Sequence, residues 1–258
     1  MNFDKLNCNS DLEYGLNVQR GLVPGVSAIH TFGRIPDITT VDGFVTVTDN
    51  GQGYTGFDAV QAEKVSIVSN SNDDTPAGPG AHVLLLTGLG AGFVEQSETV
   101  VINGTTPVTT TLDYIRLNPV LVVVAGANGV NTGQILLTQE ITTSVIFGEI
   151  QPGNNRTLNS GYTVPAGKEA YIRSGFATLG RKSNAVSEVK AMARRPGSVF
   201  QTAEWFSAHS QGSSYVQRPF VLPLISIPAG TDIKIMANTD TNGVDVSAGL
   251  EMYLVDVT

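Results

Sequence analysis

Short segments in which apolar and polar residues alternate recur along most of the chain. Val45 and Val47 alternate with threonines, and residues 65–67 and 170–176 show the same two-residue period. A period of two places every second side chain on one face of a sheet, and Val, Ile and Thr pack well on such a face. Glycine, asparagine or proline bounds these segments, as turns between strands require. The pattern predicts an all-β protein.

Residues 183–195 (SNAVSEVKAMARR) fit two different patterns. In a helix, Ala185, Val189 and Met192 would share one face. In a strand, Val189 and Ala191 would point inward and the charged residues beside them would point outward. We favour the strand.

Turn-rich stretches divide the chain into three parts. Glycine and proline interrupt residues 1–27, so this segment resembles an extended N-terminal arm more than a packed layer. Residues 151–155 (QPGNN) suit a linker between packed units. We therefore expect two β-sandwich domains, residues 28–150 and residues 151–258, after the arm.

Two segments of the second expected domain repeat one device. Residues 164–168 (VPAGK) and residues 227–231 (IPAGT) each lead into a strand pattern. Proline fixes φ and glycine supplies a permissive position, so each segment predicts a turn followed by a strand. Recurring corners of this kind suit a sandwich, and we expect this domain to be jelly-roll-like.

Composition limits the partners and the chemistry. The 258 residues carry a net charge of −8, which opposes binding to nucleic acid or to anionic lipid. Cys8 is the one cysteine, so an intramolecular disulfide and a Cys-based zinc site are excluded, while its role stays open. No apolar run approaches the ~18 residues that span a bilayer, and the N-terminus lacks the pattern of a secretion signal. We expect neither nucleic acid nor membrane as a partner.

Two glycine-rich segments have the composition of nucleotide-binding loops. Residues 88–92 (GLGAG) follow an apolar run, but the sequence after them shows no helix that would meet a phosphate. Residues 126–133 (GANGVNTG) lack the Lys-Ser/Thr pair of a P-loop. We interpret the first as a hairpin loop and the second as a turn between strands, and we expect no cofactor.

Catalytic and metal-binding patterns are weak. His30, His82 and His209 lie in unrelated contexts without a nucleophile elbow, so the sequence assigns no catalytic residue and we expect no enzyme. Asp240 and Asp245 flank an Asn-Gly pair and offer oxygen ligands for calcium, although the EF-hand pattern is absent. A simple Asx-Gly turn is the favoured interpretation, with calcium left as the alternative.

Charge is unevenly distributed and indicates an interface. Residues 37–113 contain ten acids and one base, whereas residues 156–195 contain eight of the 15 basic residues. Two basic pairs in the second segment suit an acidic partner or the acidic part of a neighbouring subunit, with ordinary solvated charge as the alternative. In residues 200–222, which we interpret as loop-rich, aromatic residues suit interface anchors or the core of the domain. The interface candidates are Arg181, Lys182, Arg194, Arg195, Trp205, Phe206 and Tyr215.

Four phrases in a fixed order resemble a family of virion structural proteins encoded by tailed bacteriophages. They are residues 29–38 (IHTFGRIPDI), 65–80 (VSIVSNSNDDTPAGPG), 103–111 (NGTTPVTTT) and 162–171 (YTVPAGKEAY). The resemblance covers residues 28–258 and leaves residues 1–27 unassigned. It implies a place in the virion, assembled in the host cytoplasm, and supplies no catalytic residues.

The resemblance implies a capsid decoration or cement protein as the first hypothesis. Such a protein would bind the major capsid protein on the outer shell and associate with itself, as a homotrimer. A tail or fibre component that binds a host surface glycan is the alternative. A glycan-degrading tail enzyme is the weakest alternative, because no acidic pair stands out in the sequence.

Overall fold

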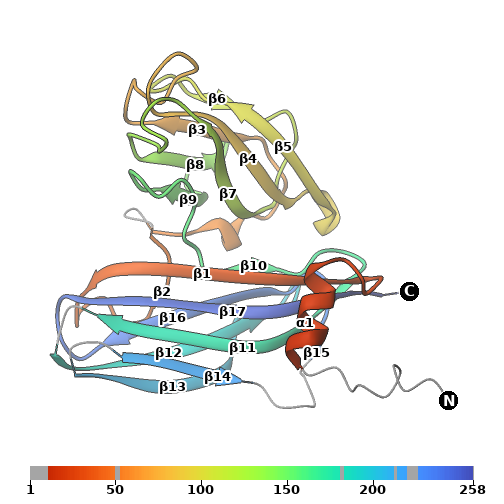
Figure 1. The fold of residues 1–258 in the computed structure, drawn as a ribbon, viewed down its shortest axis with the longest axis vertical. Coiled ribbons are helices and arrows are strands. Elements are labelled where there is room, and N and C mark those ends of the chain that lie inside the picture. The colour runs from red at the N-terminus through yellow and green to blue at the C-terminus, as the bar shows by residue number, and fades with distance from the viewer. Residues whose placement is uncertain (1–10, 50–52, 181–182, 212–213, 220–225, 258) are drawn as a thin grey trace.

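A computed structural model describes residues 11–49, 53–180, 183–211, 214–219 and 226–257. The strands of these residues form four antiparallel sheets, which confirms the all-β prediction. The sheets lie in two pairs, and each pair encloses its own hydrophobic core. In Figure 1 the pair with shorter strands stands above the pair with longer strands. We call them the short-strand pair and the long-strand pair.

The long-strand pair is built from the two ends of the chain. Its first sheet has the order β1-β17-β11-β14, and β15 also pairs with β11. Its second sheet has the order β10-β16-β12-β13, and β2 also pairs with β16. The bounds are β1 Val26–Ile38, β2 Val45–Thr46, β10 Tyr162–Thr163, β11 Lys168–Gly180, β12 Ser183–Arg194, β13 Gln201–Gln211, β14 Ser214–Pro219, β15 Ser226–Ile227, β16 Asp232–Thr239 and β17 Val244–Asp256.

The short-strand pair is built from the middle of the chain. One sheet has the order β6-β3-β8-β9 and the other has the order β5-β4-β7. Its core contains fully buried side chains from both sheets, such as Ile67, Leu84 and Leu137. The bounds are β3 Val65–Ser69, β4 Ala81–Leu89, β5 Glu95–Val101, β6 Val108–Thr109, β7 Arg116–Ala125, β8 Ile135–Gln139 and β9 Ile146–Ile150. Two 3-10 turns, η2 (Gly56–Asp58) and η3 (Ala91–Phe93), complete it.

Strand β12 settles the ambiguous segment 183–195 as a strand, as favoured from the sequence. Ala185 and Val189 are buried in the long-strand core. Lys190, the residue after Val189, is only partly buried. The strand pairs with β13 on one side and β16 on the other. A central position between two strands satisfies its backbone on both edges, which outweighs the helix propensity of its alanines.

Strands β1 and β2 join the long-strand pair, although the sequence grouped them with residues 28–150. Thirteen-residue β1 runs antiparallel to β17, with Val26 opposite Val255, and β2 pairs with β16. Gly33 allows β1 to pass close to Val47, because a Cβ at this position would lie 1.9 Å from the Val47 carbonyl oxygen. Periodicity identifies a strand but does not specify its partner, so pairing between the chain ends was not predictable from it.

Residues 11–19 form helix α1 (Asp11–Gln19), so the expected extended arm is corrected over this part. Val18 is buried, and the Tyr14 ring meets the Tyr253 ring edge-on at a centroid distance of 5.5 Å. Packing against β17 therefore compensates for Gly15 within the helix, which propensity alone disfavours. Cys8 and the rest of residues 1–10 lie outside the described residues.

The two Pro-Ala-Gly segments form matching turns, as predicted. Gly167 and Gly230 both have φ of +74°, and strands β11 and β16 follow the turns. The turns also contact each other, since the Gly230 amide donates to the Val164 carbonyl at 2.8 Å. In residues 200–222 the structure corrects the loop interpretation, because β13 and β14 occupy most of that segment.

Candidate interaction surface

The glycine-rich segments have structural roles. Residues 88–92 connect β4 and β5 through η3, which confirms the hairpin loop. At Gly88 a Cβ would lie 2.4 Å from the Arg116 carbonyl oxygen, so close strand packing explains this glycine. Residues 126–133 connect β7 and β8, and Gly129 has φ of +68°, which confirms the turn.

The candidate calcium ligands accept hydrogen bonds from the chain itself. The Val186 amide donates to the Asp240 carboxylate at 2.8 Å and lowers its pKa. Asp245 forms an ion pair with Arg34 at 3.0 Å, and Asn242 accepts from the Thr40 amide at 2.8 Å. Among the residues that the structure describes, no cluster of three His, Cys, Asp or Glu side chains could hold a metal ion. The geometry fits the Asx-Gly turn.

The three histidines lie on three different strands. His30 on β1 stacks on Phe176 with an interplanar angle of 6°, and His82 on β4 lies 2.7 Å from the Gly78 carbonyl oxygen. His209 is exposed on β13 rather than in the loop expected from the sequence. His30 therefore packs against an aromatic ring, His82 contacts a backbone carbonyl, and His209 lies on an exposed strand surface.

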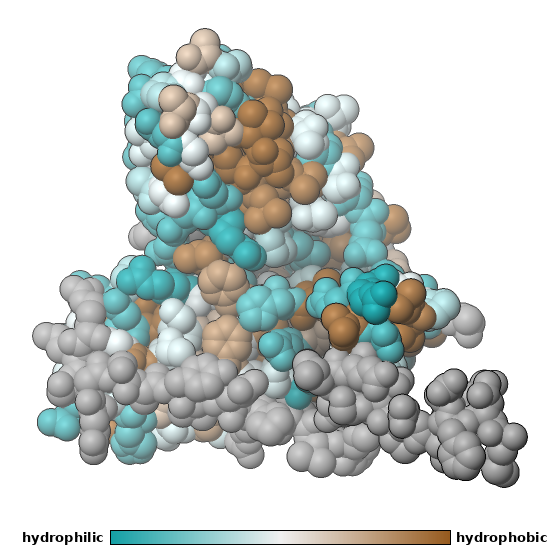
Figure 2. Space-filling model, in the orientation of Figure 1, coloured by the Kyte–Doolittle hydropathy of each residue, from teal (hydrophilic) through white to brown (hydrophobic). Residues whose placement is uncertain are grey.

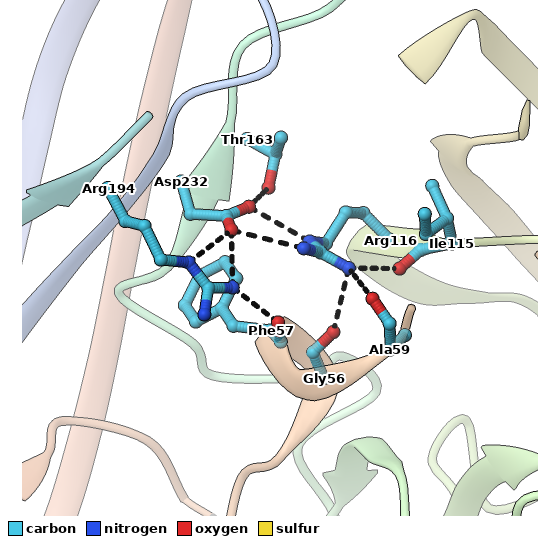
Figure 3. A network of polar contacts seen from close by, with 8 residues as sticks. All are labelled: Gly56, Phe57, Ala59, Ile115, Arg116, Thr163, Arg194 and Asp232. Atoms are coloured by element: carbon cyan, nitrogen blue, oxygen red, sulfur yellow. Dashed lines mark hydrogen bonds and ion pairs between the residues drawn. The ribbon is translucent and has the colours of Figure 1, made fainter. Parts of the chain in front are cut away.

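A buried polar network joins the short-strand pair to the long-strand pair (Figure 3). Arg116 of β7 forms an ion pair with Asp232 of β16, with Nε and Oδ1 2.8 Å apart. Both side chains are at most 6% exposed, and Thr163 donates a further hydrogen bond to the carboxylate. Nη2 of Arg116 also donates to Asp232, and Nη1 donates to the Ala59 carbonyl at 3.0 Å, near η2. The arrangement satisfies the buried charges from both sheet pairs.

Arg194, an interface candidate, belongs to this network. Its guanidinium lies 2.7 Å from Asp232 and also donates to the carbonyl of Phe57. The neighbouring candidate Arg195 is exposed. The structure therefore separates two adjacent arginines, because successive residues near a strand end point in different directions. Arg181 and Lys182 lie outside the described residues.

Trp205 lies at the centre of an exposed cation–aromatic cluster on the outer side of β12 and β13. Its side chain is 51% exposed and meets the Phe44 ring edge-on at 5.6 Å. The Lys190 ammonium lies 3.3 Å from the Phe44 ring centroid and 4.6 Å from that of Trp205. We call Phe44, Lys190 and Trp205 the Trp205 surface. Exposed tryptophan beside a cation is typical of protein contact sites.

A second cation–aromatic cluster lies on the same sheet. Arg194 and Lys234 approach the Phe200 ring, with cation-to-centroid distances of 4.5 and 4.2 Å. Burial lowers the pKa of Lys234, while Asp58 opposes that shift. The outer side of this sheet thus places Lys190, Arg194 and Lys234 beside aromatic rings, with Arg194 already paired to Asp232.

The remaining candidates divide between core and strand. Phe206 packs against the long-strand core, which supports the core alternative for this residue. Tyr215 lies on β14 opposite Thr178 of β11, and its side chain is outside the description. Phe44, Lys190 and Lys234 were missed from the sequence because they are far apart in the chain. The strand interpretation of residues 183–195 did contain one signal, since it placed Lys190 and Arg194 on the same outward face.

Comparisons with known proteins give weak structural similarities. No family model matches the chain, and no curated protein matches its sequence. A chain of the Cowpea mosaic virus top component, a naturally occurring empty particle, is similar with a TM-score of 0.23 and 9% identity over 74% of this chain and 82% of that chain. A structure of infectious bursal disease virus strain Gx gives a TM-score of 0.26 and 8% identity over 90% of this chain and 72% of that chain. The VP2 subviral particle of infectious bursal disease virus gives a TM-score of 0.22 and 10% identity over 91% of this chain and 72% of that chain.

Helices contribute little to the described part of the chain. The longest that we describe, α1, has nine residues, and none there is both long and apolar enough to cross a bilayer.

Proposed function

We propose that this chain is a virion structural protein of a tailed bacteriophage, and that it decorates and stabilises the outer capsid shell. Its partners would be the major capsid protein and further copies of itself, and it would carry out no catalysis. The observation that carries the proposal is the ordered set of four sequence phrases that resemble the phage family. Their places in the fold add support.

The phrases coincide with structurally constrained positions. Residues 29–38 lie in β1, where Gly33 passes close to the Val47 carbonyl oxygen. Residues 162–171 contain the Pro-Ala-Gly turn before β11. A resemblance that includes such positions concerns the fold, because each position constrains how distant strands meet.

The second phrase forms a loop around a buried carboxylate. Asp74 is fully buried and accepts hydrogen bonds from the amides of Ala81, Thr132 and Gly133, each at 2.8 Å, and from Ser69 Oγ at 2.6 Å. These contacts tie the loop after β3 to the turn before β8. A rigid loop of this kind suits a protein whose task is to hold its shape under load.

Docking would use exposed surface without a reacting group. A decoration protein stabilises a shell by burying its surface across the junctions between capsid subunits. The Trp205 surface offers an aromatic anchor and a cation for an acidic partner, with Arg195 exposed nearby in the chain. Its support is a sheet, so little conformational freedom is lost on binding.

Copy number in purified particles tests the proposal. Quantitative gel analysis should give a copy number comparable to that of the capsid subunits, and a particle reconstruction should show the chain on the outer shell. A copy number of only a few per virion, or density on the tail, would overturn shell decoration.

The exposed Trp205 ring also favours one alternative, a tail or fibre protein that binds a host surface glycan. Sugar rings stack on exposed aromatic faces, and Trp205 is half exposed. This alternative predicts a low copy number and loss of adsorption in Trp205→Ala particles. Retained adsorption together with fragile heads would favour decoration instead.

A further inference from the structure

The three-stranded sheet of the short-strand pair is apolar on its outer side as well as on its core side. In β4, Leu84 and Leu86 are fully buried, so Val83 and Leu85, which alternate with them, point away from the core. Figure 2 shows apolar surface gathered on the short-strand pair over β4 and β7. A sheet with one solvated face normally alternates apolar and polar residues, and this sheet departs from that pattern.

Strand register defines this surface. Val83 lies opposite Val101 of β5 and Val124 of β7, and Leu85 lies opposite Thr99 and Leu121. Residues directly opposite one another share a face of the sheet. Val101 and Val124 are 55% and 47% exposed. We call these two rows the outer β4 face: Val83, Leu85, Thr99, Val101, Leu121 and Val124.

The six residues of the outer β4 face are uncharged, and Arg156, which pairs with Leu121 from the neighbouring segment, is a cation at the border of the face. This distribution of charge limits what can cover the face. The chain has a net charge of −8, so two copies repel each other across most surfaces. At the Trp205 surface, two copies would bring Lys190 against Lys190. Over these six residues an identical copy meets only Val, Leu and Thr side chains, whereas a partner chosen by charge finds a group to pair with only outside the face.

We propose that the outer β4 face is a self-association surface that packs against the same face of a second copy. Such a contact is isologous, with the two sheets stacked ~10 Å apart, as sheets stack inside sandwiches. The inference rests on the self-association that is part of the proposed function, and it assigns that association to named residues. If trimers form through other surfaces, the same contact links neighbouring trimers.

The size of the face sets the strength of the contact. A face three strands wide and a few residues long covers on the order of 400 Å². Two copies would together bury about 800 Å², which is less than the ~1,200 Å² of stable interfaces and typical of a weak, transient contact. The free protein therefore associates in a concentration-dependent manner, and the high local concentration on a particle surface increases the fraction of copies that form the contact.

Charge placed in the face tests the proposal. In sedimentation velocity, the average mass of the wild-type protein should rise with concentration, and Val101→Glu should weaken this association at least ~10-fold. Val60→Glu is the matched control, because Val60 is 92% exposed and lies outside the face. A wild-type mass that stays constant with concentration, or association of Val101→Glu equal to that of the wild type, would overturn the inference.

Cross-linking gives an independent readout that does not depend on charge. In a Cys8→Ser background, Thr99→Cys should be linked between copies by a short bifunctional maleimide, and Val60→Cys should not. Equal linking of both variants would also overturn the inference. Shell decoration with high copy number would survive that result, and absence from particles would remove the proposed function while leaving the face-to-face contact intact.

Discussion

Arg116 and Asp232 show how one residue pair can tie two cores together. Replacing Arg116 by Met leaves the buried Asp232 carboxylate with Arg194 as its remaining cation. Removing one partner of a buried pair typically costs about 3–5 kcal/mol, because the other charge stays desolvated. Because Arg194 still pairs with the carboxylate, we expect Arg116→Met to lower the free energy of unfolding by up to that amount in urea denaturation.

An exposed ion pair supplies the control for this prediction. Arg34 pairs with Asp245 at 3.0 Å, but its side chain is 44% exposed. Solvent screens such a pair, so Arg34→Met should cost at most about 1 kcal/mol. Equal losses in the two variants would show that the Arg116 network contributes no more than a surface contact.

Glu63 predicts a pH dependence of stability. The amide of Thr142 donates to its carboxylate at 2.9 Å and the Thr142 hydroxyl donates at 2.7 Å, which lowers the pKa of Glu63 to about 2. A folded-state pKa below the unfolded value of about 4.3 stabilises the fold above pH ~4.3, and the contribution is lost as pH falls toward 2. Glu63→Gln should therefore be less stable than wild type at pH 7, with the difference shrinking between pH 4.3 and 2.

Urea midpoints at pH 7 and pH 3 measure this difference. Glu140→Gln removes an exposed carboxylate on the neighbouring turn and serves as the comparison variant. If Glu63→Gln and Glu140→Gln shift the midpoint equally at both pH values, the hydrogen bonds from Thr142 do not carry the effect.

Strand β1 is the element that closes the long-strand pair, and Gly33 is its narrowest point. A Cβ at Gly33 would lie 1.9 Å from the Val47 carbonyl oxygen and 2.7 Å from the Ser160 amide nitrogen. Both neighbours are backbone atoms, so relief requires strands to shift. We expect Gly33→Ala to destabilise the protein by about 3 kcal/mol, the upper part of the range for overpacking, in urea denaturation.

Gly180 provides a glycine without such a neighbour. Apart from the adjoining residues, no atom of the described part of the chain lies within 4 Å of a Cβ built at this position, which ends β11. Gly180→Ala should change stability by less than about 1 kcal/mol and in the stabilising direction, because alanine restricts the unfolded chain. If both variants lost the same stability, the close approach of backbone atoms at Gly33 would not be the cause of the destabilisation.

Element type was predictable from the sequence, and element partnership was not. The two-residue period identified β12 as a strand, and the Pro-Ala-Gly phrases identified both turns, because these signals are local. Helix α1 was missed because its stability comes from packing on β17, where Tyr14 meets Tyr253. The pairing of β1 with β17 joins the two ends of the described chain, and no local pattern encodes it.

The candidate site was predictable to a smaller extent for the same reason. Trp205 and Arg194 were named from their residue types, which are common at interfaces. Asp232, which fixes Arg194 inside the molecule, comes from a strand that is 38 residues away in the sequence. A charge pattern along the chain indicates basic segments but does not indicate which guanidinium is already paired.

Across the whole molecule, charge and apolar surface are distributed over different faces. The acidic middle of the chain forms the short-strand pair, whose outer β4 face is uncharged, and the long-strand pair presents cations beside aromatic rings. Under the two proposals, the molecule would bind its own copies with one face and an acidic partner with another. The two contacts would not compete, because they use different sheet pairs.

A substitution at Trp205 tests whether self-association and binding to the particle use different faces. Truncating an exposed aromatic anchor at the centre of an interface typically costs about 2 kcal/mol or more of binding free energy. We expect Trp205→Ala to reduce the affinity of the protein for particles that lack it by at least ~10-fold, measured by co-sedimentation, without changing its self-association. Val199→Ala is the control, because Val199 is 71% exposed in the segment before β13. Since Trp205 is itself half exposed, its loss should leave the fold intact, and particle binding equal to that of wild type would remove the Trp205 surface from the capsid contact.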